Sequence, residues 1–383
     1  MRRLALLSLL LLPALELLAE PLQITSTQMQ WKADKHAATS SWTSSQWAEG
    51  AIKLPYVLPA SPAAARINEV MFLSQLNMPA PREAGKSFAL GEGVMPPDGT
   101  ASLDFSVRHN DGRVLALEIN TEGCGAYCEE FRQYFSFDAQ TGRFLLIDDI
   151  LTSHGLSEIG RRFFAERKRQ YRQQIRNLRR ELAQAHKTGK RKKDDIEDTE
   201  FRIALNEDCL TPFQEMPGDA ALRNALRSTR FVLTGQGLEF TAERCSNHAS
   251  RALDDVGEVT LTLGLKDLAA LLQPYGRYLL TGEGDAAAPV ALHGQVLHGK
   301  VGSAPITLRI NPLNDDNSFS GLYYYDKYRK PIPFSGKKTG KRLEFTEEAA
   351  QGEAGSFTLS QDAAGLSGSW QRQDKTLPVR LGW

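Results

Sequence analysis

Alternating apolar and polar positions indicate strands in the first half of the chain. Residues 101–108 and 114–119 alternate on either side of an Asp111-Gly112 turn, a pattern that predicts a β-hairpin. A third strand is expected over residues 131–137, and after a second turn a fourth over residues 144–147. Together these segments predict an antiparallel meander.

One short strand and one helix precede this meander. The strand is expected over residues 51–55, where it meets prolines. Residues 63–76 place their apolar side chains on one broad face, as in a helix packed on a sheet. Ser61 supplies a helix cap and Pro62 a residue that suits the first turn.

Residues 156–205 follow a helical period instead. Their apolar positions recur at intervals of three or four residues, or of two such intervals together, and so form one stripe along a helix. The stripe consists of Ile159, Phe163, Tyr171, Ile175, Leu178, Leu182 and Ala185. The remaining positions between 161 and 193 include 14 Lys or Arg residues, against only Glu166 and Glu181. An acidic run follows at residues 194–200. We interpret the segment as a basic helical insertion in a strand-rich domain.

This basic face has two interpretations. It is an anion-binding surface for acidic polymers or anionic lipid, or it is a solvated helix face that the acidic run partly neutralises by folding back. Membrane binding would normally place Trp or Phe beside the cations, and aromatic residues are few here. We therefore expect the solvated face.

A second hairpin, at residues 231–241, and a further strand at 258–263 close the first domain. Residues 266–272 predict a short amphipathic helix that ends at Pro274. Residues 284–289 are small and flexible, and we interpret them as a linker.

Residues 290–383 contain about eight short strands separated by Gly-rich turns. Strands at this regular spacing predict a small sandwich or an up-and-down barrel. The predicted fold is therefore α+β. An antiparallel-sheet domain at residues 20–283 carries the helical insertion, and an all-β domain follows.

The first 19 residues are expected to be a signal peptide. Met1-Arg2-Arg3 is basic, Leu4 to Leu12 is apolar, and small Ala19 offers a cleavage site. The apolar run is shorter than the roughly 20 residues that cross a bilayer. No cysteine follows it to accept a lipid, and no later stretch suits a transmembrane helix. We expect a periplasmic or secreted protein.

The cysteine count supports export. There are four cysteines, Cys124, Cys128, Cys209 and Cys245, and an even number in an exported chain indicates disulfides. Among the three possible pairings we favour Cys124–Cys128 and Cys209–Cys245. A zinc site is the alternative, but structural zinc usually takes two closely spaced pairs and only one is present.

The sequence gives little sign of catalysis. Net charge is zero, which gives a nucleic-acid partner no global electrostatic support. No His-Glu-x-x-His, Gly-x-Ser-x-Gly or phosphate-loop motif occurs, and no cofactor or metal site is predicted. His248, with Asp254 and Asp255 downstream, is the one candidate for a base oriented by a carboxylate. Its alternative is a loop histidine fixed by the neighbouring disulfide.

Several short motifs resemble the DUF3298 family. They are Cys124-Gly-Ala-Tyr-Cys128, Tyr134-Phe-Ser-Phe-Asp138, Thr141-Gly142 and Leu146-Ile-Asp-Asp-Ile150, in the family's order. Upstream, Leu54-Pro55 and Ile67-Asn68 resemble the companion DUF4163 region. The resemblance covers roughly residues 45–280. It implies an envelope binding module, because such domains include the lysozyme-binding part of an anti-sigma factor and non-catalytic neighbours of peptidoglycan deacetylases.

We therefore predict an exported, non-catalytic binding protein of the bacterial envelope, which recognises a lysozyme-like hydrolase or peptidoglycan. Its contact residues are expected in two loops, around Tyr127 and from His248 to Arg251. Loops fixed by disulfides lose less entropy on binding. The alternatives are a cell-wall enzyme with a site near His248 and a structural envelope protein without a ligand. The oligomeric state is left open.

Overall fold

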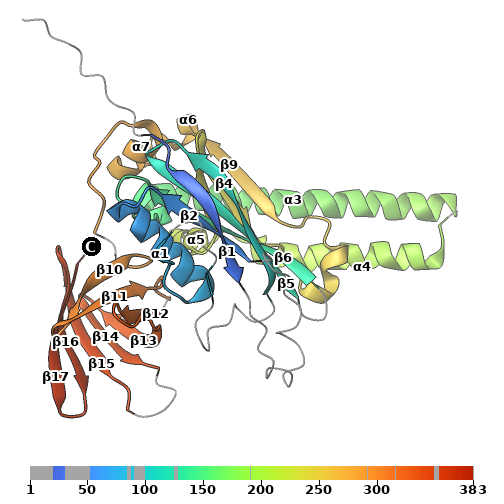
Figure 1. Cartoon of the computed structure of the whole chain (residues 1–383). Helices are drawn as coiled ribbons and strands as arrows, with labels where there is room; N and C mark the ends of the chain where they lie inside the picture. Colours follow the sequence, from blue (N-terminus) through green and yellow to red (C-terminus); the bar gives the residue numbers. More distant parts are fainter. Residues whose placement is uncertain are drawn as a thin grey trace, which may run out of the picture.

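The computed structural model describes residues 20–30, 52–83, 88–89, 100–124, 128–189, 191–290, 292–314, 316–348 and 353–382. The expected signal peptide lies outside these residues. The fold is α+β, as predicted: antiparallel sheets with helices come first, and a closed eight-stranded barrel follows (Figure 1).

Two three-stranded sheets and one helix form the first part of the N-terminal domain. In one sheet β1 (Gln23–Gln30) pairs antiparallel with β2 (Lys53–Leu58) and parallel with β3 (Phe88–Ala89). The other is the predicted meander of β4 (Thr100–Asn110), β5 (Val114–Cys124) and β6 (Cys128–Asp138). Helix α1 (Pro62–Leu76) begins as expected, because the Ser61 hydroxyl accepts a hydrogen bond from the Ala64 amide at 3.0 Å.

The predicted fourth strand of the meander is wrong. Phe144 makes only an isolated bridge with Phe137, and the chain then turns into the short helix α2 (Ile147–Ile150). The Asp149 carboxylate causes this turn by accepting a hydrogen bond from the Leu146 amide at 2.9 Å. A local side-chain bond to the backbone thus replaces a strand ladder.

The second part of the N-terminal domain is also an antiparallel sheet with helices packed beside it. Strands β7 (Arg230–Thr234), β8 (Gly237–Ala242) and β9 (Val259–Gly264) form a third sheet, as the hairpin pattern predicts. Helices α5 (Asp219–Arg227), α6 (Leu265–Leu268) and α7 (Pro274–Thr281) and the 3-10 turns η1 (Thr211–Phe213) and η2 (His248–Leu253) complete it. Pro274 begins α7 and does not end a helix at 272, since a proline loses no helical bond in a first turn.

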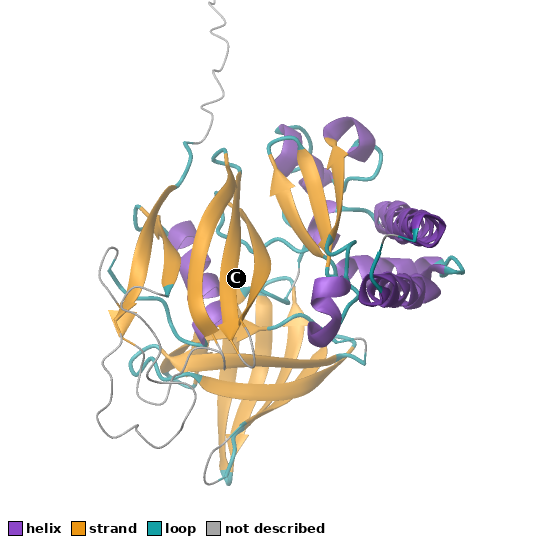
Figure 2. Cartoon of the chain, turned by 90° about the vertical axis from the view of Figure 1, so that its right-hand side faces the viewer, coloured by secondary structure: helices purple, strands orange, loops and turns teal. Residues whose placement is uncertain are grey.

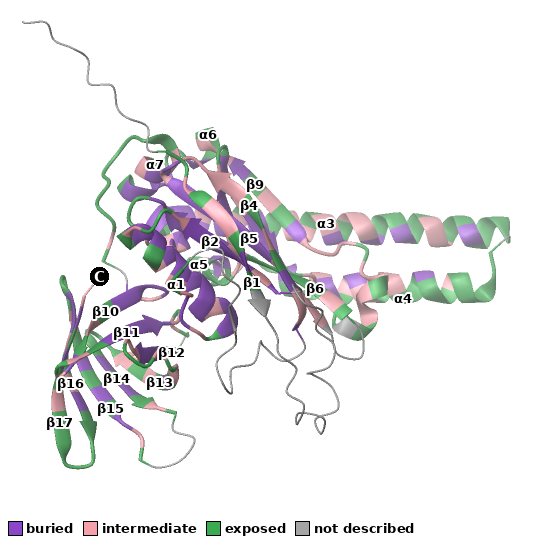
Figure 3. Ribbon diagram, viewed as in Figure 1, coloured by how far each residue is buried: buried purple, intermediate pink, exposed green. Residues whose placement is uncertain are grey.

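The basic insertion is an antiparallel pair of helices, which we call the helical arm. Helix α3 (Ser153–Thr188) and α4 (Lys193–Leu210) project from the body of the molecule (Figure 1). Figure 2 views both nearly end-on beside the sheets. The predicted apolar stripe is correct, because Ile159, Phe163 and Tyr171 are at most 5% exposed. Toward the tip of the arm most positions are exposed (Figure 3). No helix in the described part of the chain is both long and apolar enough to cross a bilayer.

The C-terminal domain is a closed antiparallel barrel of consecutive strands. They are β10 (Val296–Val301), β11 (Ala304–Ile310), β12 (Ser318–Tyr325), β13 (Ile332–Thr339), β14 (Arg342–Glu347), β15 (Ser356–Asp362), β16 (Gly365–Arg372) and β17 (Lys375–Gly382). Closure leaves no free strand edge, because β10 pairs with β17. Packed aromatic side chains fill the barrel, including Phe334, Phe345 and Phe357.

The barrel packs its outer wall against the N-terminal domain. Val296, Leu322 and Tyr324 belong to the same apolar cluster as α1. The Arg329 guanidinium lies 3.6 Å from the Glu69 carboxylate of α1. Burial raises the pKa of Glu69, and Arg329 partly offsets that effect. The two domains are therefore joined by shared apolar packing and an ion pair as well as by the linker.

Candidate functional site

The structure brings the segment that follows Cys128 against the predicted loop from His248 to Arg251. Arg251, in η2, forms an ion pair with Glu129, at the start of β6. More than one hundred residues separate them in the sequence. The surface that results consists of Cys128–Arg132, Glu243–Arg251, Arg230 and Glu258, and we call it the docking face.

The first predicted loop connects β5 to β6 between Cys124 and Cys128. Cys124 and Cys128 lie opposite each other in the strand register, and Cys128 is disulfide-bonded. The side chain of Cys124 and the whole of Tyr127 lie outside the described residues. Beyond Cys128, Glu129 turns toward Arg251, while Phe131 is 50% exposed.

The second loop is held by the side chains of Asp254 and Asn247. Asp254 accepts hydrogen bonds from the Gly257 amide at 2.9 Å and from the Ser246 amide at 3.3 Å. Asn247 caps η2 by accepting from the Ser250 amide at 3.0 Å. These bonds fix the backbone on both sides of His248, whose side chain lies outside the described residues.

The other acid near His248 has a different partner. Asp255 accepts from two nitrogens of Arg202 on α4, with the Nε bond at 3.0 Å, and this hydrogen bonding raises the pKa of Arg202. The carboxylates expected to orient His248 are therefore bound to the loop backbone and to the helical arm.

The predicted Cys209–Cys245 disulfide is present and joins the arm to the docking face. Its Cα atoms lie 5.7 Å apart. Cys209 ends α4 within a cluster that includes Phe164, Tyr171 and Phe213, and Cys245 begins the second loop. The base of the arm is thereby covalently attached to one side of the docking face.

A shallow hollow of about 190 Å³ lies on the docking face. It is lined by four arginines and four glutamates, with Phe131, Ser246 and Asn247: Glu129, Glu130, Arg132, Arg230, Glu243, Arg244, Arg251 and Glu258. Arg230 is engaged, because it contacts Glu258 at 2.7 Å and donates to the Arg132 carbonyl at 2.8 Å.

Other charges of the hollow are free to meet a partner. Among the described residues, the side chains of Glu130, Arg132, Glu243 and Arg244 make no hydrogen bond or ion pair within the chain. Exposed charges of both signs beside an exposed aromatic ring suit a recognition surface. The hollow can contact both acidic and basic groups of a ligand.

Sequence reasoning named Arg251 but not the other charged residues that line the hollow. A local signal was present, because Glu129-Glu130 directly follows Cys128 and Glu243-Arg244 directly precedes Cys245. Charged pairs next to cysteines in both loops could have identified the lining. The pairing of the two loops could not be found this way, since it depends on how the sheets pack.

The acidic run folds back beside the basic helix, as predicted, but its ion pairs in the described contacts lie within α4. Glu197 pairs with Lys193 at 3.3 Å and Asp198 with Arg202 at 3.9 Å, both within α4. In the described contacts, α3 cations instead meet acids such as Glu158, Glu166 and Glu207. Four cations, Lys168, Arg169, Arg172 and Arg176, line a separate groove of about 410 Å³ on α3. Part of the arm therefore stays cationic.

Comparison with known proteins finds a match only among solved structures. No protein-family model matches the chain, and no curated protein matches its sequence. One matching solved structure is the crystal structure of a member of the DUF3298 family from Bacteroides fragilis. It is 12% identical, the match covers 70% of this chain and all of that one, and the TM-score is 0.38. This is the family that the sequence motifs resemble.

Proposed function

We propose that the protein is an exported, non-catalytic binding protein of the bacterial envelope, and that it engages its partner through the docking face. The observation that carries the proposal is the Arg251–Glu129 ion pair. This pair joins two cysteine-bearing loops around one charged hollow. A surface held in this way loses little conformational entropy on binding, which favours affinity.

The shape of the hollow favours a protein partner. Its volume of about 190 Å³ is below the roughly 300–1,000 Å³ typical of small-molecule pockets. Phe131 stands exposed beside Arg132 and Arg244, whose side chains have no partner among the described residues. Aromatic and arginine side chains are the residues that most often dominate protein–protein binding energies.

A lysozyme-like hydrolase is the partner we propose, with peptidoglycan as the alternative ligand. The motifs that resemble the DUF3298 family suggest this pair, because domains of that family include a lysozyme-binding module. Export is supported by the basic and leucine-rich start of the chain and by the Cys209–Cys245 disulfide, a bond typical of oxidising compartments.

A binding role has better support than a catalytic one. The binding role rests on described contacts, whereas the enzyme hypothesis needs a carboxylate that orients His248, whose side chain lies outside the described residues. Incubating the protein with purified sacculi checks this point, since release of soluble wall fragments that is lost in His248→Ala would establish an enzyme.

Affinity capture with charge-reversed variants tests the proposal. The mature chain, residues 20–383, is immobilised and offered lysozyme and sacculi separately. Arg244→Glu removes a docking-face charge that has no described partner, so the fold should persist. Lys341→Glu, at an exposed barrel turn, is the matched control.

We expect the wild type and Lys341→Glu to retain lysozyme equally, and Arg244→Glu to retain at least tenfold less. Retention of sacculi with the same dependence on Arg244 would replace the hydrolase with peptidoglycan. Equal retention by all three proteins, or none by the wild type of either ligand, would reject the docking face.

A further inference from the structure

A second hollow, unrelated to the docking face, lies where the two domains meet. Its volume is about 330 Å³, which is within the range of small-molecule sites. Four segments line it: α1, the turn after β6, the linker and the start of the barrel, with Ala363 from a barrel turn. Ligand pockets occur preferentially at such domain junctions.

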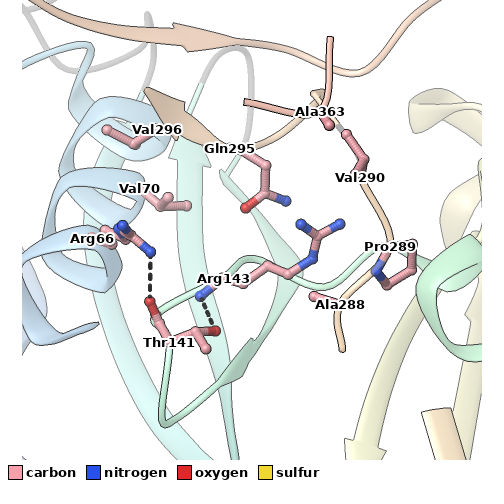
Figure 4. A pocket seen from close by; sticks show the side chains of 11 residues that line it. Arg66, Val70, Thr141, Arg143, Ala288, Pro289, Val290, Gln295, Val296 and Ala363 are labelled. Atoms are coloured by element: carbon pink, nitrogen blue, oxygen red, sulfur yellow. Dashed lines mark hydrogen bonds between the residues drawn. The ribbon is translucent and has the colours of Figure 1, made fainter. Parts of the chain in front are cut away.

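The walls of this junction pocket are largely apolar. Val70 comes from α1, Val296 from β10, Pro289 from the linker and Val290 from the position just after it. Figure 4 shows Val70 and Val296 on one side, and Val290 and Ala363 on the other. The pocket therefore offers room for a small hydrocarbon group between two apolar walls.

Two guanidinium groups enter this apolar space. Arg143 contacts the buried Asp149 carboxylate at 2.9 Å, so its charge is already compensated. Arg66 donates only to the Thr141 carbonyl, at 3.1 Å, and forms no ion pair among the described residues (Figure 4). Arg66 thus leaves one positive charge without a counter-ion at the pocket.

The backbone holds these groups in place. Gly142 lies between Thr141 and Arg143 with φ +74°, and a Cβ there would come within 2.3 Å of the Ala63 carbonyl of α1. Gln295 is 6% exposed and donates to the Phe144 carbonyl at 2.7 Å, which ties the start of the barrel to the same turn. The pocket is therefore preformed.

We infer that the junction pocket binds a small amphipathic carboxylate, with its acid group on Arg66 and its apolar part between Val70, Val296 and Val290. A guanidinium matches the planar geometry of a carboxylate and pairs with it through two parallel hydrogen bonds. The volume equals that of roughly ten water molecules in the liquid, so a ligand of about ten heavy atoms fits.

Isothermal titration with octanoate, which has ten heavy atoms, tests this inference. Octanol presents the same chain without the charge. Arg66→Gln removes the cation, and Val290→Trp fills the pocket from an exposed position next to the linker. Arg82→Gln, at an exposed position outside the pocket, is the control. Circular dichroism and thermal melting verify that each variant is folded.

We expect saturable one-to-one binding of octanoate to the wild type and to Arg82→Gln. Octanol with the wild type, and octanoate with Arg66→Gln, should bind at least tenfold more weakly, and Val290→Trp should not bind. Absence of octanoate binding at millimolar concentration, equal affinity for octanol, or an unchanged Arg66→Gln would each overturn the inference. The docking face contributes no residue to this pocket, so either proposal can fail alone.

Discussion

The barrel and the docking face use aromatic and charged side chains in opposite ways. Inside the barrel, Phe357 is 1% exposed and stacks on Phe345 with ring centroids 4.5 Å apart. On the docking face Phe131 is 50% exposed among eight charged residues. From this difference we expect substitutions in the barrel core to lower the free energy of unfolding. Substitutions on the docking face should weaken binding and leave stability nearly unchanged.

The largest expected effect is in the barrel core. Phe357→Ala should lower the free energy of unfolding by about 3–5 kcal/mol, because it removes a buried ring and leaves a cavity. Phe131→Ala, the same change on the docking face, should alter it by about 0.5 kcal/mol or less. Urea unfolding of both variants measures the contrast, and similar losses in the two would contradict it.

The disulfide at the base of the arm should have the next largest effect. It closes a loop over a sequence separation of 36 residues, so replacing Cys209 and Cys245 by Ala should cost roughly 4 kcal/mol. The second loop should also lose its anchor, so partner binding should weaken in the same variant. Urea unfolding and titration measure the two losses. Lost stability with unchanged binding would separate the arm from the docking face.

A half-buried carboxylate at the barrel end should contribute less. Glu347 accepts hydrogen bonds from the Trp370 indole at 2.9 Å, the Gly355 amide at 2.8 Å and the Tyr323 hydroxyl. Burial, and then the hydrogen bond to Glu347, raise the pKa of Tyr323, which keeps it protonated as a donor. Glu347→Gln should cost about 1–3 kcal/mol, since one acceptor oxygen is lost.

Glu344→Gln is the matched control for that change. Glu344 lies on the same strand and is exposed. In the described contacts its side chain forms an ion pair with Arg342, two residues earlier on that strand. It should change the unfolding free energy by less than about 1 kcal/mol. Equal effects in the two glutamate variants would show that the barrel end gains nothing from its hydrogen bonds.

A smaller effect should appear in the pH dependence, with opposite signs in two regions. Burial raises the pKa of Glu69 at the domain junction above 4.5. Protonated Glu69 therefore contributes to the free energy of unfolding below pH 4.5, and this contribution is lost as the pH rises through the pKa of Glu69 in the folded protein. On α3, the hydrogen bond from Arg169 lowers the pKa of Glu166 to about 2, so its contribution is present above pH 4.5 and is lost as pH falls.

Paired variants measure these slopes. Relative to the wild type, Glu69→Gln should become more stable as pH rises from 4, and Glu166→Gln should lose its disadvantage as pH falls from 4.5 toward 2. Unfolding curves collected across this range provide both differences. Parallel slopes for the two variants would contradict the assigned environments.

The barrel could be predicted closely from the sequence, because alternation and Gly-rich turns decide local strand pairing. All eight strands pair with their sequence neighbours, and the ends close the ring. The errors occurred where a single side chain decides the outcome. Asp149 turned an expected strand into a helix start, and Pro274 began a helix that the apolar pattern did not indicate.

The docking face could be predicted only in part. Cysteine spacing identified both loops and the Cys209–Cys245 bond, and Arg251 was among the expected contacts. Glu129 was not, since its role depends on a partner far along the chain. The junction pocket was missed entirely, because Arg66 and Val290 come from segments that approach only through domain packing.

The central claim is that the Arg251–Glu129 pair organises the docking face. Titrating lysozyme into the mature wild type, Arg251→Glu, Glu129→Arg and the double exchange measures it directly. We predict that each single reversal weakens binding at least tenfold, and that the double exchange, which restores an ion pair, recovers most of the affinity. Single variants that bind as tightly as the wild type, or a wild type that does not bind, would contradict the account.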